Sequence, residues 1–162
     1  MAFDTYIAFS KDIKGEATAI KDSIEILSFS WGASSPATVG GGKAGIAASR
    51  VSISSFNFAK KTDTSSTQLF LAACKGSIIP TVTVHMRKQT GNAQEDFLIL
   101  TFTNAMVETL QQSGSSGGDD TPMESVSLAF EKIAISYKKQ GADNKLSAGG
   151  DAAWDLTKLV TK

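Results

Sequence analysis

An alternating segment at residues 24–31 constrains the fold of this chain more than any other part of the sequence. Successive side chains of a strand point to opposite faces, so this segment divides into a bulky face and a face of small hydroxyl groups. The bulky face holds Leu27, Phe29 and Trp31, and the other face holds Ile26, Ser28 and Ser30. One face can bury its side chains while the other remains polar and smooth.

A tract of small residues follows at residues 33–49, and it carries little charge. It includes the run Gly40, Gly41, Gly42, Lys43, Ala44 and Gly45. This composition predicts a long, mobile loop that reaches toward a partner. A strand face of small hydroxyl groups beside a loop that reaches toward a partner favours a role in assembly over a role in catalysis.

Composition narrows the class of protein further. The 162 residues predict one domain, residues 1–162, with 41% hydrophobic and 20% charged residues. Sixteen basic residues balance sixteen acidic ones, which argues against nucleic acid or an anionic membrane as partner. The longest apolar runs, such as residues 97–102, are too short to span a bilayer. The single Cys74 cannot form an internal disulfide.

The start of the chain, residues 1–6, lacks the basic and apolar regions of a signal peptide. We therefore expect synthesis in the cytoplasm, and any export would use a route that ignores such signals.

Most of the sequence alternates with a period of two, which predicts strands at residues 4–9, 24–31, 50–58, 81–88, 95–103, 106–111 and 124–138. One extra residue offsets the apolar positions near Ser54 or Ser55, which indicates a bulge. A similar offset follows Phe130, and we expect a kink at Asn104. Bulges bend a sheet, so the sequence predicts a mainly β fold: an antiparallel β-barrel of two sheets with one short flanking α-helix.

The helix is expected to begin with a capping box, in which Ser65 is the cap and Gln68 reaches back to its amide. Apolar residues follow, and Gly76 is placed to end the helix after about three turns. Residues 113–120 have turn chemistry throughout and are expected to join two strands. Residues 141–151 are interpreted as a loose connector, and residues 153–160 as a last short strand.

Catalytic and metal-binding patterns are absent from the sequence. The only histidine, His85, has no second histidine or cysteine cluster with which to share a metal. The glycine tract fails as a phosphate-binding motif because Ala37 and Ala44 occupy its two defining end positions. Asp119 and Asp120 are interpreted as a solvated hairpin tip. We therefore expect no enzyme activity, no cofactor and no metal.

Several segments, in order and spacing, resemble the Hcp family, the tube protein of bacterial type VI secretion systems. They span nearly the whole chain: residues 6–9, 13–16, 27–32, 40–45, Asp63, 71–76, 83–88, 113–118, 124–130, 135–137 and 154–156. The resemblance implies a β-barrel with a flanking helix, six-membered rings and the stacking of those rings into a hollow tube. It also implies a contractile sheath, a VgrG spike and effector proteins as partners, and secretion by the type VI system.

A ring suggests roles for two sets of residues. Ser28, Ser30, Ser52 and Ser54 are expected to line the lumen, with Ser30 as a candidate cargo contact. The alternative, that they are ordinary solvent-facing strand serines, stays open. The tract at residues 34–49, centred on Val39, Gly40, Gly41, Gly42, Lys43, Ala44 and Gly45, is the expected ring-stacking arm.

Two other functions remain as alternatives. One is a monomeric β-barrel or sandwich that binds a small ligand or a carbohydrate, although the sequence shows no concave aromatic cluster. The other is an enzyme of unrecognised type, which the lack of histidines and metal ligands disfavours. A ring of six would have a mass of about 102 kDa, six times the chain mass of 17.0 kDa, and both alternatives predict a monomer.

Overall fold

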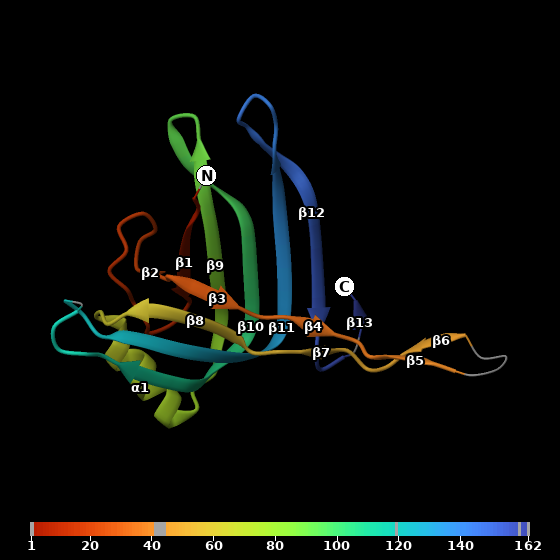
Figure 1. Ribbon diagram of the computed structural model, residues 1–162, viewed down its shortest axis with the longest axis horizontal. Coiled ribbons are helices and arrows are strands. Elements are labelled where there is room, and N and C mark those ends of the chain that lie inside the picture. Colours follow the sequence, from red (N-terminus) through yellow and green to blue (C-terminus); the bar gives the residue numbers. More distant parts are fainter. Residues whose placement is uncertain (1, 41–44, 119, 159, 162) are drawn as a thin grey trace.

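The chain folds into a curled antiparallel sheet with a helix packed beneath it and a long two-stranded arm (Figure 1). This is a computed structural model, and it describes residues 2–40, 45–118, 120–158 and 160–161. Within those residues the structure has one helix, α1 (Ser65–Lys75), which buries Leu69 and Ala72. The predicted mainly β fold with one short flanking helix is confirmed, and the sheet closes into a half-barrel.

The main sheet has nine strands, and every pairing in it is antiparallel. Seven of them lie in the order β13 (Val160–Thr161), β12 (Leu146–Asp155), β11 (Met123–Gln140), β10 (Ala93–Ser113), β9 (Ile79–Thr90), β1 (Asp4–Phe9) and β2 (Ile24–Glu25). The other two are β8 (Phe56–Lys61), which pairs with β11, and β3 (Ser28–Ser30), which pairs with β8. Because β10 and β11 are long enough to belong to both layers, the two expected sheets are one continuous sheet.

The turn from one layer to the other is made at Asn104, as predicted. Asn104 has a φ of 50°, in the left-handed region, and its side chain donates a 2.8 Å hydrogen bond to Glu131 on β11. The register of β10 and β11 is the same on both sides of this point. The offset after Phe130 is therefore not a separate bulge but the β11 half of a shared kink. A true register shift comes later, between Val107 and Thr109.

A cluster of aromatic residues fills the space between the two layers. Phe56 and Phe102 are fully buried, and their ring centroids lie 5.0 Å apart. Phe102 also packs on Phe130 at 4.6 Å, and Phe29 stacks on Phe56 at 5.8 Å. Such pairs contribute about 0.5–1.5 kcal/mol each beyond area burial. The rings hold the curl of the sheet in place.

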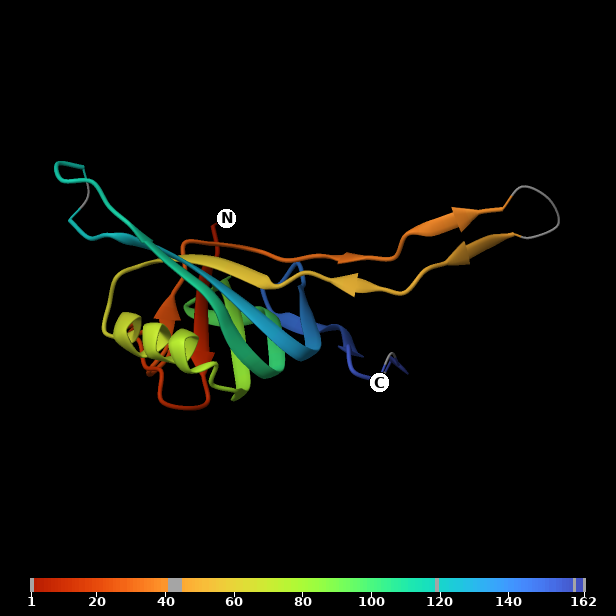
Figure 2. The same ribbon diagram turned by 90° about the horizontal axis from the view of Figure 1, so that it is seen from below.

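Residues 31–40 and 45–54 form the described part of the arm, which projects from the body (Figure 2). Its strands are β4 (Ala33–Ser34), β5 (Ala37–Val39), β6 (Ile46–Ala48) and β7 (Ser52–Ile53), paired β4 with β7 and β5 with β6. The prediction of a simple loop is thus corrected, since backbone hydrogen bonds between the two strands do not require an apolar pattern. The bulge near Ser54 or Ser55 is confirmed: four steps from Ile53 to Asn57 oppose three steps from Ser30 to Ala33.

The predicted single strand at residues 24–31 is wrong in one respect. The chain changes partner in its middle, because the Ile26 amide bonds to Thr5 on β1 and the Leu27 amide bonds to Ala59 on β8. The change of partner reverses the expected exposure of these two residues alone: Ile26 is buried and Leu27 is 51% exposed. The exposure of Ser28 and Ser30 agrees with the prediction.

The sequence predicted the residues at both ends of α1, and only the prediction for the C-terminal end is confirmed. Gly76 ends the helix with a φ of 59°. The N-cap is Thr64 rather than Ser65, whose amide and hydroxyl both donate to the Asp63 carboxylate. Gln68 does not close a capping box, because its side-chain oxygen accepts the Lys14 amide at 2.8 Å.

The C-terminal prediction is also corrected. Residues 146–155, interpreted as connector and then strand, form the ten-residue strand β12 against β11. Its centre reads Ser-Ala-Gly-Gly-Asp-Ala, and those side chains are exposed. A strand held by its backbone ladder at the edge of a sheet leaves little hydrophobic signal.

A close backbone approach fixes the segment between β1 and β2. A Cβ on Gly15 would lie 2.3 Å from the backbone oxygen of Ser23, closer than real contacts allow. We expect Gly15→Ala to lower the free energy of unfolding by about 1–3 kcal/mol, as overpacking does. Gly32→Ala is the matched control, because nothing lies within 4 Å of its Cβ position. Equal midpoints for the two variants in urea unfolding would contradict this account.

Candidate functional site: an uncharged polar face

The exposed face of the layer β3–β8–β11–β10 carries two rows of small polar side chains. Residues paired across strands lie on the same face of a sheet, so the register places them together. The first row is Ser30, Asn57, Ser127 and Thr109, and the second row is Ser28, Ala59, Ser125 and Gln111. We call these eight residues the polar face. None of them is charged at neutral pH.

The polar face lies on the inner side of a shallow arch. Seen from below, the four-strand layer continues into the turn that contains residues 114–118 and 120–122 on one side and into the arm on the other (Figure 2). Helix α1 and the rest of the half-barrel lie on the convex side (Figure 2). Six of the eight residues are exposed; Ala59 is half-buried, and Ser127 is 9% exposed and donates its hydroxyl to Asn57. The result is a continuous hydroxyl and amide surface.

The opposite face of the same strands is apolar for most of its length. One row across it consists of Phe29, Phe58, Val126 and Leu110. The alternation that buries these residues also exposes the polar face, which explains why its side chains share one orientation.

A buried ion pair interrupts the apolar side near the start of α1. Lys60 is completely buried, and its ammonium lies 2.8 Å from Glu124 and 2.9 Å from Asp63. Ser66 accepts a 3.1 Å bond from Lys60 and donates one of 2.9 Å to Glu124. Gln112 donates to the second oxygen of Glu124 at 3.1 Å. This network joins the polar layer to the helix.

The structure divides the four serines that the sequence assigned to a lumen. Ser28 and Ser30 belong to the polar face. Ser52 pairs with Ser34 in the arm, and the Ser54 hydroxyl bonds to Gly32 at the base of the arm. Their presence on the same wall remains a prediction.

Five polar-face residues with polar side chains were missed from sequence: Asn57, Thr109, Gln111, Ser125 and Ser127. The signal was present, since Ser125 and Ser127 alternate with the buried Val126 and Leu128. Their alignment with β3 depends on strand register, which the sequence does not reveal.

The arm ends in a pair of exposed apolar side chains. Val39 and Ile46 are cross-strand partners, and each is 76% exposed. Of the predicted stacking residues, Val39, Gly40 and Gly45 lie in this region. Gly41, Gly42, Lys43 and Ala44 lie outside the described residues.

Titratable groups elsewhere form local pairs. The His85 ring nitrogen Nδ1 lies 2.9 Å from Asp96, which also lies 3.1 Å from Arg87. Burial raises the pKa of Tyr6, with Asp4 and Glu25 adding to the effect. A hydrogen bond from the Thr157 hydroxyl lowers the pKa of Asp155. In the part of the chain that the structure describes, no group of acidic, histidine or cysteine side chains could hold a metal.

Among the described residues, no helix has the length and apolar character to cross a bilayer.

Comparison with solved structures identifies the class of protein. The fold is similar to a structure described as that of a type six secretion system protein, with a TM-score of 0.93 and 33% identity over 99% of this chain and 100% of that one. It is also similar to Hcp1 from Salmonella typhimurium, with a TM-score of 0.79 and 28% identity over the full length of both chains. The fold is that of a type VI secretion protein.

Sequence comparison gives the family. The family model described as type VI secretion system effector, Hcp, matches residues 6–137. The chain is 32% identical over 100 residues to protein hcp1 of Pseudomonas aeruginosa, which covers 62% of this chain and 61% of that relative. This chain belongs to the Hcp family of type VI secretion proteins. The resemblance noted in the sequence is confirmed, and the match spans about 61% of the length of the Pseudomonas relative.

Proposed function

We propose that this protein is the structural subunit of a type VI secretion tube: six copies form a ring, rings stack, and the polar face lines the bore. The observation that carries the proposal is the uncharged polar face on the inner side of the arch. A wall of hydroxyl and amide groups without charge lets folded cargo pass without strong binding. Residues 1–162 act as one tube domain.

Two free strand edges support ring closure. Among the described residues, β3 pairs only with β8, and residues 106–113 of β10 pair only with β11. These segments are the two outer edges of the layer that bears the polar face. Unpaired edges of this kind attract another chain. Pairing one edge with the other edge of the next copy is a heterologous contact, and such contacts close into rings.

Membership of the family supports a proposal for the remaining partners. We propose that the tube is ejected when a contractile sheath shortens, that a VgrG spike caps it, and that effector proteins travel in its bore. Secretion would then occur from the cytoplasm without a signal peptide.

The bore assignment is tested by Ser30→Arg. Six guanidinium groups would then line the bore of each ring where small hydroxyls now lie, so we expect effector retention to fall by about tenfold or more. The measurement is co-purification of type VI effectors with the protein from cells of the same strain. Light scattering should show an unchanged ring.

Gln89→Arg is the matched control, since Gln89 is exposed at the end of β9 and away from the polar face. It should retain effectors at the level of the unsubstituted protein. Loss of the ring in Ser30→Arg, or normal retention by it, would contradict the assignment.

A further inference from the structure

We propose that the arm of one copy docks in an acidic cleft at the opposite end of a second copy. The proposal rests on the stacking role of the arm and names the surface that receives it. The cleft has a volume of about 400 Å³ and lies where β2, β8, the start of α1 and the 114–122 turn meet. Its lining is Glu16, Ala17, Glu25, Leu27, Lys61, Thr62, Asp63 and Thr121.

The charge of the cleft indicates which segment binds in it. Three carboxylates, those of Glu16, Glu25 and Asp63, face a single Lys61 in the cleft. The buried Lys60 lies 2.9 Å from Asp63 and 2.8 Å from Glu124, so it balances only one of these two carboxylates and the cleft keeps an excess of negative charge. The arm, in contrast, carries only Lys43 and Arg50 as charged residues, and both are basic. Opposite charges steer two surfaces together and fix their register.

The cleft also offers an apolar contact. Leu27, left exposed by the change of strand partner before β3, lies on its rim with 51% of its surface exposed. The arm presents Val39 and Ile46, each 76% exposed. Two-stranded ribbons are only marginally stable alone in water. A contact that covers these three side chains would stabilise the arm as well as the assembly.

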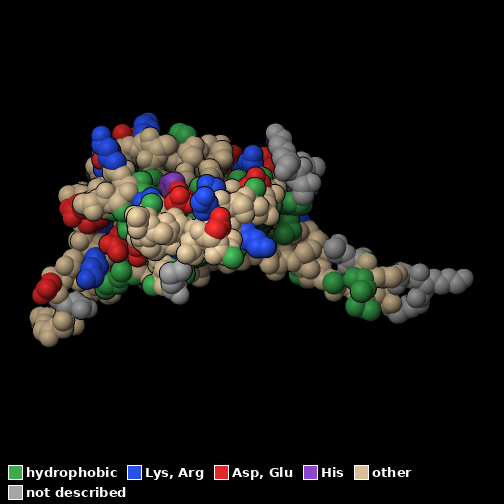
Figure 3. All heavy atoms as spheres, turned by 90° about the horizontal axis from the view of Figure 1, so that it is seen from above, with side chains coloured by type: hydrophobic (Ala, Val, Ile, Leu, Met, Phe, Trp, Pro, Cys, Tyr) green, Lys and Arg blue, Asp and Glu red, His purple; other side chains and the backbone are tan. Residues whose placement is uncertain are grey.

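The positions of the arm and the cleft require that the two come from different copies of the protein. The arm extends from one end of the longest axis, and the cleft lies at the other end of the same β3–β8 ribbon (Figures 1 and 2). Acidic side chains are visible at the end of the molecule away from the arm (Figure 3). An arm therefore cannot reach the cleft of its own chain, and docking joins copies head to tail.

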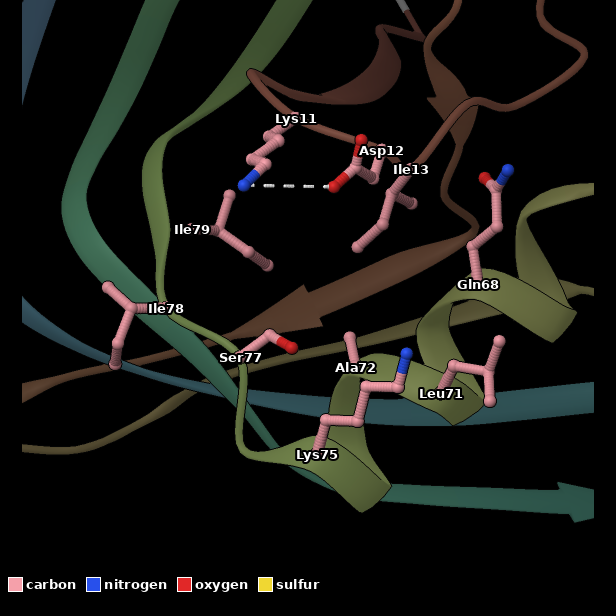
Figure 4. A pocket seen from close by; sticks show the side chains of 10 residues that line it. All are labelled: Lys11, Asp12, Ile13, Gln68, Leu71, Ala72, Lys75, Ser77, Ile78 and Ile79. Atoms are coloured by element: carbon pink, nitrogen blue, oxygen red, sulfur yellow. Dashed lines mark ion pairs between the residues drawn. The ribbon is translucent and has the colours of Figure 1, made fainter.

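A second groove on the same molecule can be compared with the acidic cleft. It has a volume of about 320 Å³ and lies between residues 11–13 and the second half of α1 (Figure 4). It also has an exposed apolar rim, including Leu71, which is 50% exposed. Its charged lining is Lys11, Asp12 and Lys75, and Asp12 already faces Lys11 at 4.0 Å. Net positive charge makes this groove unfavourable for a basic arm.

Cysteine cross-linking in the full-length protein tests the proposal. In a Cys74→Ser background, Ile46→Cys is combined with Leu27→Cys in the cleft, and separately with Leu71→Cys in the other groove. Disulfides need Cα atoms within about 7 Å, so only a true contact is trapped. We expect the Leu27 pair to give a ladder of covalent multimers on a non-reducing gel and the Leu71 pair to give none. A ladder from the Leu71 pair, or none from the Leu27 pair, would overturn the docking site.

Charge-reversal variants give a second test, in which the rate of cross-linking is measured. Glu25→Lys should lower the cross-linking rate about fivefold, and Arg50→Glu added to it should restore most of the rate. Failure of the compensating change would count against the cleft.

Ladder length separates this inference from the stacking role on which it rests. A ladder that continues past six protomers supports docking between rings. A ladder that stops at six supports the contact but overturns the stacking role, since the arm would then join neighbours within one ring.

Discussion

Lys60→Met lowers the free energy of unfolding by about 3–5 kcal/mol, the usual loss when one partner of a buried ion pair is removed. The substitution leaves Glu124, whose side chain is 1% exposed, without its 2.8 Å cation. Asp63 loses its partner as well, and with it a tie to the first turn of α1. Typical domains have a free energy of unfolding of about 5–15 kcal/mol, so this change removes a large part of the stability.

The neighbouring Lys61→Met is the matched control. Lys61 is exposed, and substitutions of that kind usually change stability by less than about 0.5 kcal/mol. Adding Glu124→Gln to Lys60→Met should recover part of the loss, because a neutral amide is cheaper to bury than an unpaired carboxylate. Urea unfolding at one protomer concentration measures all three. A Lys60→Met midpoint equal to that of Lys61→Met would show that the network is not a source of stability.

Removing residues 37–48 and closing the arm with a two-residue Asn-Gly turn abolishes the stacking of rings. The deletion takes out β5 and β6 with the exposed Val39 and Ile46, but it leaves β4 and β7 paired at the base. The polar face and the free edges of β3 and β10 are untouched. We therefore expect single rings of unchanged mass, and no tubes in electron micrographs of concentrated protein.

Shortening of the turn at residues 141–145, between β11 and β12, is the corresponding control, because this turn belongs neither to the arm nor to the acidic cleft. It should leave tubes intact if the arm supplies the stacking contact. Tubes of normal length from the arm deletion would rule out the stacking role.

Much of the fold could be predicted because bulky residues alternate along β1, β8, β9 and the first part of β11. Phe56 and Phe58, for example, are buried as their spacing indicates. The strands of the arm and β12 could not be predicted, because backbone pairing alone holds these strands and small exposed side chains leave no pattern. The partner change between Ile26 and Leu27 was missed for a related reason: a continuous alternation does not show which strand each half pairs with.

The candidate site, like the fold, could be predicted only in part. Ser28 and Ser30 were found because they alternate with aromatic residues on one strand. The wider polar face needs four strands in one register, and that register depends on pairing between residues as distant in the sequence as Asn57 and Ser127. The acidic cleft combines residues from four separate segments, so no local sequence signal could reveal it.

The central claim is that the protomers close into a six-membered ring around the polar face. Light scattering of the purified protein, with electron micrographs of the same sample, tests it most directly. The account predicts a particle of about 102 kDa, six times 17.0 kDa, that appears as an annulus with an open centre. A monodisperse particle of 17.0 kDa at all concentrations would contradict it and would favour a monomeric ligand-binding module instead.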